Sequence, residues 1–167
     1  MMKKLLSKNY SVVGIEVDKR DFIYFNDKEM VNTTSNEIGN TIVKYSDKDI
    51  VLVDINSSRK AESLCNDVLC LVEPSIIKLN KLMMLDRNAF AKIKKEDKKL
   101  VLNKSLLSSK DILEFEYESK SKVWYNLPPL DDRERNIHAL SRFLIKLGFE
   151  VETDEEVSKK NKILGIF

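Results

Sequence analysis

The chain has 167 residues, a length typical of one domain with a substantial core. Apolar residues make up 43% and charged residues 34%, which excludes a disordered chain. The 29 basic and 27 acidic residues leave a net charge of only +2, and lysine far outnumbers arginine. We therefore expect no direct nucleic-acid binding.

Short apolar runs along the chain are candidate β-strands. They cover residues 11–17, 49–55, 67–73, 99–103 and 122–127. The first four are nearly continuous in apolar residues, which is typical of strands buried on both faces, as in a parallel sheet.

The segments between these strands predict helices. They cover residues 35–45, 75–96, 108–119 and 131–148. The second follows Pro74, the third opens with a capping-box pattern at Ser108 and Asp111, and the fourth ends at Gly148. Alternating strands and helices predict an α/β fold, with an open, mainly parallel sheet that has helices on both faces.

The predicted domain covers residues 1–148, and residues 149–167 form a charged tail. Cys65 and Cys70 match neither a zinc site nor a redox motif, which favours a reducing compartment. The sequence shows neither a secretory signal pattern nor a stretch of 18 apolar residues, so we expect a cytoplasmic location.

Polar residues follow the predicted strands. Glu16 and Asp18 end the first, and Asp54 and Asn56 end the second. Asp54 lies in an otherwise apolar run, so it needs a partner if it is buried. Ligands bind beyond the carboxyl ends of strands in such sheets, so these residues indicate a Mg²⁺ or phosphate site. Loop-start and helix-cap residues are the alternative interpretation.

The order of these motifs resembles the MinD/ParA family of deviant P-loop ATPases. Residues 5–22 resemble the end of that family's first helix, its second strand and the switch I loop. Asp18 matches a carboxylate near Mg²⁺ and the attacking water, which makes it the candidate catalytic residue. Residues 49–58 resemble the Walker B strand and switch II, so the resemblance gives Asp54 the Mg²⁺-linked position and Asp18 a second one.

The resemblance continues toward the nucleotide base and covers roughly residues 3–148. Residues 68–82 resemble the following strand and helix. The motif "LVLNKS" gives Asn103 the place of an asparagine that contacts adenine, and "LPPLDDRERN" places Pro128 and Asp131 beside the base. The resemblance implies a P-loop NTPase-like fold with ATP and Mg²⁺ as cofactors.

The family's glycine-rich phosphate loop does not occur in this sequence. Its four glycines are Gly14, Gly39, Gly148 and Gly165, which are too far apart for that loop. We therefore expect a P-loop-like fold that lacks the phosphate-loop strand and does not hydrolyse ATP by itself.

Three interpretations follow. The chain is a truncated member of a family whose full-length ATPases act as positioning and partitioning switches. Alternatively, it is a pseudo-ATPase that acts as a protein-interaction or membrane-associated adaptor. The third is an unrelated, receiver-like α/β binding domain. A missing central strand would leave residues 49–55 without a neighbour, so we expect a protein partner or a homo-oligomer.

The tail resembles the C-terminal membrane-targeting helix of MinD. Residues 158–167 place three lysines beside Ile163, Leu164, Ile166 and Phe167, which share one side of a helix. This pattern predicts a peripheral contact at the inner face of the membrane. A frayed terminus, or a final element packed on the core, is the alternative.

Overall fold

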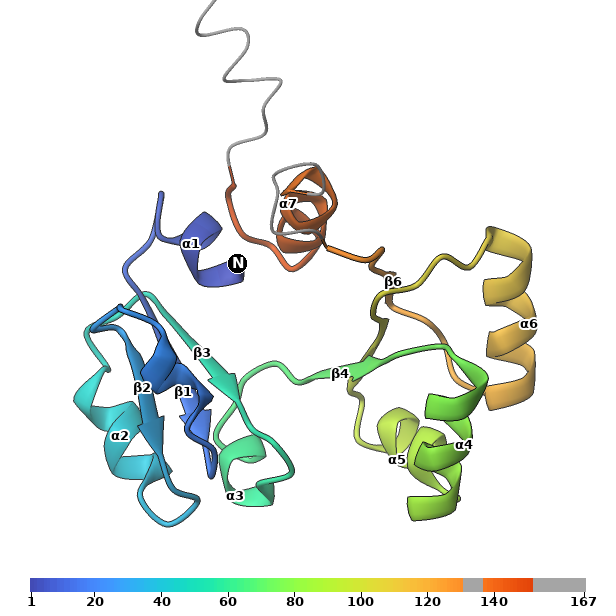
Figure 1. Ribbon diagram of the computed structural model, residues 1–167, viewed down its shortest axis with the longest axis horizontal. Helices are drawn as coiled ribbons and strands as arrows, with labels where there is room; N and C mark the ends of the chain where they lie inside the picture. The colour runs from blue at the N-terminus through green and yellow to red at the C-terminus, as the bar shows by residue number, and fades with distance from the viewer. Residues whose placement is uncertain (131–136, 152–167) are drawn as a thin grey trace, which may run out of the picture. The chain divides into compact units, whose positions relative to one another are not determined.

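The computed structural model describes residues 1–130 and 137–151. They form two compact units, residues 1–66 with 148–151, and residues 67–130 with 137–147. The division falls inside the region 1–148 that the sequence predicts as one domain. Each unit contains an open, parallel, three-stranded sheet (Figure 1), and the described residues include seven α-helices. The predicted α/β class with parallel strands is confirmed, but the described strands form two three-stranded sheets where the sequence predicts one.

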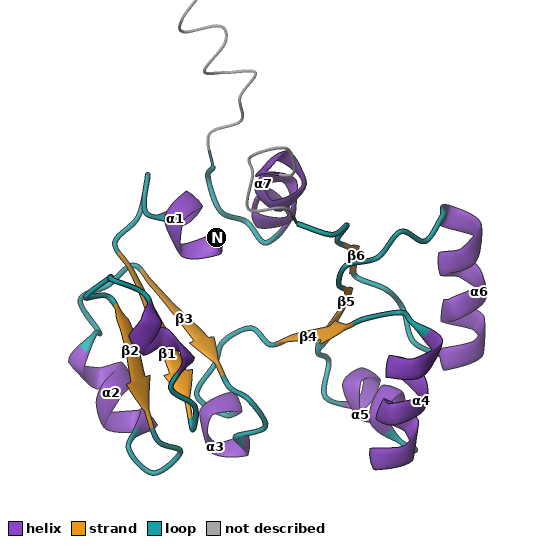
Figure 2. Cartoon of the chain, viewed as in Figure 1, coloured by secondary structure: helices purple, strands orange, loops and turns teal. Residues whose placement is uncertain are grey.

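The first sheet has the strand order β2–β1–β3. Its strands are β1 (Val12–Val17), β2 (Met30–Thr33) and β3 (Ile50–Asp54), and both pairings are parallel. All six residues of β1 are buried, as expected for a central strand covered on both faces. Figure 2 shows the three arrows side by side.

Helices and one 3₁₀ helix cover the first sheet. They are α1 (Met2–Leu6), η1 (Asp21–Tyr24), α2 (Ile38–Lys44) and α3 (Arg59–Glu62). Ile38 and Ala61 pack with Val13, Ile15 and Val17, so α2 and α3 cover the same face. On the other face, a Cβ at Gly14 would lie 2.6 Å from the sulfur of Met30. Any larger residue at this position would require the Met30 side chain to shift.

The second sheet has the order β4–β5–β6, again with parallel pairings. Its strands are β4 (Leu69–Val72), β5 (Lys99–Leu102) and β6 (Tyr125–Asn126). The helices of this unit are α4 (Ile76–Leu85), α5 (Ala89–Lys95), α6 (Ser109–Ser119) and α7 (Ile137–Lys146). Phe90, Leu79 and Phe115 belong to one core cluster, so α4, α5 and α6 pack together against the sheet.

Several predicted elements differ from the structure in extent. The helix predicted over 75–96 is two helices, because Asp86 has an extended backbone (φ −149°, ψ 99°) that ends α4. The strand predicted over 122–127 is paired only at Tyr125 and Asn126. The sequence analysis missed β2 and α3, whereas α1 overlaps the helix end that the resemblance places at the start of residues 5–22. The predicted capping box of α6 is present between Ser108 and Asp111.

Each sheet has two edge strands. Among the described strands, β2 and β3 pair with β1 alone, and β4 and β6 pair with β5 alone. The amide of Ile50 donates to the carbonyl of Ser11, on the side of β1. Alternate residues of a parallel strand direct their backbone groups to the same side, so those of Val51 and Val53 point away from β1. The carbonyls of Val68 and Val72 accept from β5, so Leu69 and Leu71 direct theirs away from β5.

No helix in residues 1–130 and 137–151 is long and apolar enough to cross a membrane. The residues predicted to contact a membrane, Ile163, Leu164, Ile166 and Phe167, lie outside the described residues.

Candidate functional site

The carboxyl edge of the first sheet brings Asp18 and Asp54 to the ends of neighbouring strands. Glu16 is paired in register with Asp54, and Asp18 lies two residues beyond Glu16. Asp54 is the last residue of β3 and is exposed, and its Oδ1 accepts the amide of Asn56 at 3.3 Å. Asp54 therefore does not need the partner that a buried carboxylate would require, because it is exposed to water.

Asp18 is held by the loop that follows β2. Its Oδ1 accepts the backbone amide of Ser35 at 2.8 Å, and its Oδ2 accepts the Ser35 hydroxyl. These two hydrogen bonds hold the pKa of the Asp18 carboxyl below its ordinary value. The hydroxyl oxygens of Ser35 and Ser58 lie 2.7 Å apart, which links Asp18 to the loop after β3.

Glu16 is the buried carboxylate of this edge, with 1% of its surface exposed. Its Oε2 accepts the backbone amides of Asp21 at 2.7 Å and Phe22 at 3.1 Å, and also the side-chain amide of Asn32. A buried carboxylate is tolerated when several donors satisfy it. Glu16 therefore positions η1 and the loop that carries Asp18.

The backbone of this edge is unusual. Asp18 (φ 58°), Asn56 (φ 47°) and Ser57 (φ 127°) all have positive φ although none is glycine. The side-chain amide of Asn56 donates to the carbonyl of Val17 at 2.8 Å, which ties the two strand ends together. Such conformations cluster at binding and catalytic sites, because the surrounding structure must hold them in place.

These residues fit only part of a Mg²⁺ site. Mg²⁺ is commonly bound by one or two carboxylates together with phosphates and water. Asp18 and Asp54 are a donor set of that kind. Within the part of the chain that the structure describes, no group of three or more His, Cys, Asp or Glu side chains is arranged to hold a metal ion.

The carboxyl edge of the second sheet carries the residues predicted to contact adenine. The amide of Asn103 donates to the carbonyl of Val72 at 2.8 Å, directly after β5. Pro128 follows β6 by two residues, and both Asn103 and Pro128 are half-buried. Because β5 and β6 are parallel neighbours, Asn103 and Pro128 end adjacent strands. Asp131 lies outside the described residues.

Two further features of this edge were not found by sequence analysis. The Oδ1 of Asn126 is buried with no hydrogen-bond partner in the structure, although its Nδ2 donates to the carbonyl of Leu107 at 3.3 Å. Lys104 has a positive φ of 53°, and its ammonium lies 3.5 Å from the carboxylate of Glu73. Neither feature has a local sequence signal, since both depend on contacts between strands.

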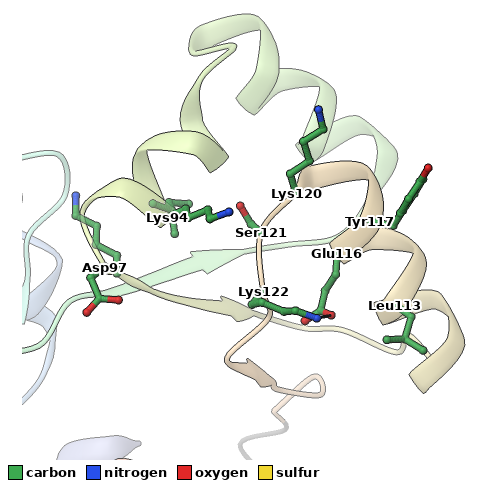
Figure 3. A pocket seen from close by; sticks show the side chains of 10 residues that line it. Lys94, Asp97, Leu113, Glu116, Tyr117, Lys120, Ser121 and Lys122 are labelled. Carbon is green, nitrogen blue, oxygen red and sulfur yellow. Dashed lines mark hydrogen bonds and ion pairs between the residues drawn. The ribbon is translucent and has the colours of Figure 1, made fainter.

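A cavity of about 490 Å³ lies elsewhere in the second unit, between α5 and α6. Its wall includes Ile93, Leu113 and Tyr117, and Figure 3 shows Lys122 beside Glu116, with the ammonium 2.9 Å from the carboxylate. Its residues precede β5 and β6, so this cavity lies toward the amino ends of these strands. Ligands of open α/β sheets bind at the opposite ends.

Searches against protein-family models and against curated proteins found no match for this chain.

Proposed function

We propose that this chain forms the part of a MinD/ParA-like ATPase domain that follows the phosphate loop. The observation that carries the proposal is the open edge of β3, the strand that resembles Walker B. In that family the phosphate-loop strand lies centrally, next to the Walker B strand. Without the phosphate-loop strand, the Walker B strand of such a domain has no neighbour on one side. The strand β3 is apolar and unpaired on one side in the same way.

The two carboxyl edges support different parts of nucleotide recognition. In the first unit, Asp18 and Asp54 end adjacent parallel strands, as Mg²⁺-side groups of the family do. In the second unit, Asn103 and Pro128 end adjacent parallel strands, as adenine-side groups do. The cofactors of this proposal are ATP and Mg²⁺.

The chain does not contain the groups that do most of the work in phosphoryl transfer. Catalysis of this reaction depends on a phosphate cradle, a lysine and Mg²⁺ that stabilise charge. The glycine pattern of the cradle does not occur in the sequence. By itself, the chain should therefore not hydrolyse ATP.

A pseudo-ATPase adaptor is the second candidate, and one contact favours it. Both carboxylate oxygens of Asp18 accept hydrogen bonds from Ser35, so this side chain already has a structural role. An adaptor would keep the sheet as a platform for a protein partner and would not need Asp18 to reach Mg²⁺.

Nucleotide titration followed by NMR distinguishes these candidates. For an ATPase-derived site, ADP should shift the amides of Asn103 and Leu127 with an affinity of roughly millimolar, about 4 kcal/mol, because only the base is well recognised. GDP carries the same phosphates and should shift them less. Asn103→Ala should remove the difference between the two nucleotides. Equal, unselective responses to ADP and GDP would favour the adaptor.

We also propose that the tail contacts anionic membranes. Four apolar residues with neighbouring lysines give only marginal membrane affinity, so stable attachment would need two copies. Co-sedimentation with anionic liposomes should weaken in Phe167→Glu. If deletion of residues 158–167 leaves sedimentation unchanged, the tail is not an anchor.

A further inference from the structure

Helix α4 exposes large apolar side chains on the face that points away from its own core. Leu79 and Leu82 pack against the core cluster of the second unit. Five large apolar residues of α4 are exposed. Four of them, Ile76 (78%), Ile77 (69%), Met83 (37%) and Met84 (85%), share one face of the helix, whereas Leu85 (88%), its last residue, lies about 140° from Asn80. With Asn80, the first four form what we call the α4 stripe. Large apolar groups gathered on a surface typically mark an interaction site.

The α4 stripe is symmetric about Asn80. Ile76 and Met84 lie four residues before and after it, and Ile77 and Met83 lie three before and after. At 100° per residue, the five side chains fall within about 120° of the helix circumference, with Asn80 at the centre. When the helix is reversed about Asn80, each apolar position of the stripe falls on another apolar position.

We infer that the α4 stripe binds the same stripe of a second copy of this chain, antiparallel and about a two-fold axis at Asn80. Two-fold interfaces use one surface that complements itself. Here Ile76 would face the partner's Met84, and Ile77 the partner's Met83. The Asn80 side chain carries both a donor and an acceptor, so two copies can hydrogen-bond to each other across the axis.

The charges of α4 are compatible with this arrangement. An antiparallel pair brings the positive N-terminal end of each helix beside the negative C-terminal end of the other. Asp86, the C-cap, would then lie near the first turn of the partner's helix, but its carboxylate is already paired with Lys92 at 2.5 Å, so the helix dipoles carry most of this complementarity. Lys81 lies about 100° from the centre of the stripe, so its ammonium can remain in water.

The inference is independent of the nucleotide proposal, since α4 carries none of the candidate nucleotide residues. Stable interfaces typically bury roughly 800 Å² on each partner. One helix face with four apolar side chains provides less, so the dimer should form reversibly and only at high protein concentration.

Cysteine cross-linking tests the position of the axis. In a Cys65→Ser, Cys70→Ala background, Asn80→Cys should form a disulfide-linked dimer under mild oxidation, because the two thiols would meet at the axis. Lys78→Cys is the matched control. It is exposed on the same helix but about 160° from the centre of the stripe, and should remain monomeric. Equal cross-linking of both variants, or of neither, would overturn the inference.

Light scattering tests the contact without cross-links. Met84→Glu should abolish the concentration-dependent dimer, since it places a charge in the apolar contact. Leu113→Glu alters an exposed apolar residue of α6 (64% exposed) and should leave the dimer intact. Association through the open edges of β3 or β4 would survive Met84→Glu. That result, or a monomer at all concentrations for the unmodified chain, would refute the α4 dimer.

Discussion

The two sheets share one plan, a central strand with a parallel neighbour on each side, but their central strands differ. In the first unit, β1 has six buried residues, including Glu16. In the second unit, β5 has four residues and only Leu100, Val101 and Leu102 are buried. The central strand of the first sheet thus carries a buried charge toward its carboxyl edge, whereas that of the second is apolar along its buried length.

The polar groups at the two carboxyl edges are held in different ways. Glu16 and Asp18 accept hydrogen bonds from backbone amides and short side chains of neighbouring loops. Glu73, at the corresponding edge of the second sheet, contacts Lys104 at 3.5 Å and Lys78 at 3.9 Å, and both lysines are well exposed. Exposed ion pairs contribute little rigidity. The first edge is therefore preformed, whereas the carboxylate of the second edge is held less firmly.

The largest expected effects come from the two cores. Ile15 and Leu100 are 0% and 1% exposed, so Ile15→Ala and Leu100→Ala should each cost about 3 kcal/mol of unfolding free energy. If the units unfold separately, hydrogen exchange should show lost protection in residues 1–66 for the first variant and in 67–130 for the second. Loss across the whole chain in both variants would show that the units unfold together.

The two edges should differ in their response to loss of a carboxylate. Glu16→Ala leaves two backbone amides and the Asn32 side chain without their acceptor, so it should cost about 3 kcal/mol. Glu73→Ala breaks only exposed ion pairs and should cost less than about 1 kcal/mol. Urea unfolding of both variants gives the comparison. Equal losses would contradict the view that only the first edge is preformed.

Sequence reasoning found the strands whose burial produces continuous apolar runs. It missed β2, because "MVNT" is short and only Thr33 is buried. It also joined α4 to α5, since apolar periodicity continues from Leu85 to Ala89 across the extended residue Asp86. Periodicity reports which faces are apolar, whereas the end of a helix depends on the backbone of a single residue.

The predicted site residues lie at strand ends, but their contacts were not predictable. The link from Ser35 to Ser58 joins loops 23 residues apart, and no spacing rule anticipates it. The burial of Glu16 and the exposure of Asp54 also reverse the expectation from local sequence, in which Asp54 was the carboxylate needing a partner. The amides of η1 satisfy Glu16 in the central strand, whereas Asp54 ends an edge strand and is exposed.

Each unit has a helix with a serine N-cap, Ser58 at α3 and Ser108 at α6, so the effects of removing the two hydroxyls can be compared. Ser58 accepts the amide of Ala61 and Ser108 accepts that of Asp111, both at 3.3 Å. Ser58→Ala and Ser108→Ala should each cost about 1 kcal/mol. Ser58→Ala should also shift the amide signals of Ser35 and Asp18, whereas changes in Ser108→Ala should remain near α6. If Ser58→Ala affects only α3, its contact with Ser35 has no structural role.

The smallest expected effect is the pH dependence of Asp18. Hydrogen bonds from Ser35 lower the pKa of Asp18 in the folded state relative to the unfolded chain. The resulting stabilisation is therefore fully present above the unfolded pKa and is lost as the pH falls through the folded pKa. NMR titration of the Asp18 carboxyl carbon should show this low pKa, and Ser35→Ala should raise it toward the ordinary value. Asp111, whose pKa is lowered by Ser108 in the second unit, is the internal control and should not change in Ser35→Ala. An unchanged Asp18 pKa in that variant would mean that the link through Ser35 does not organise the first edge, and the contrast between the two edges would then rest on Glu16 alone.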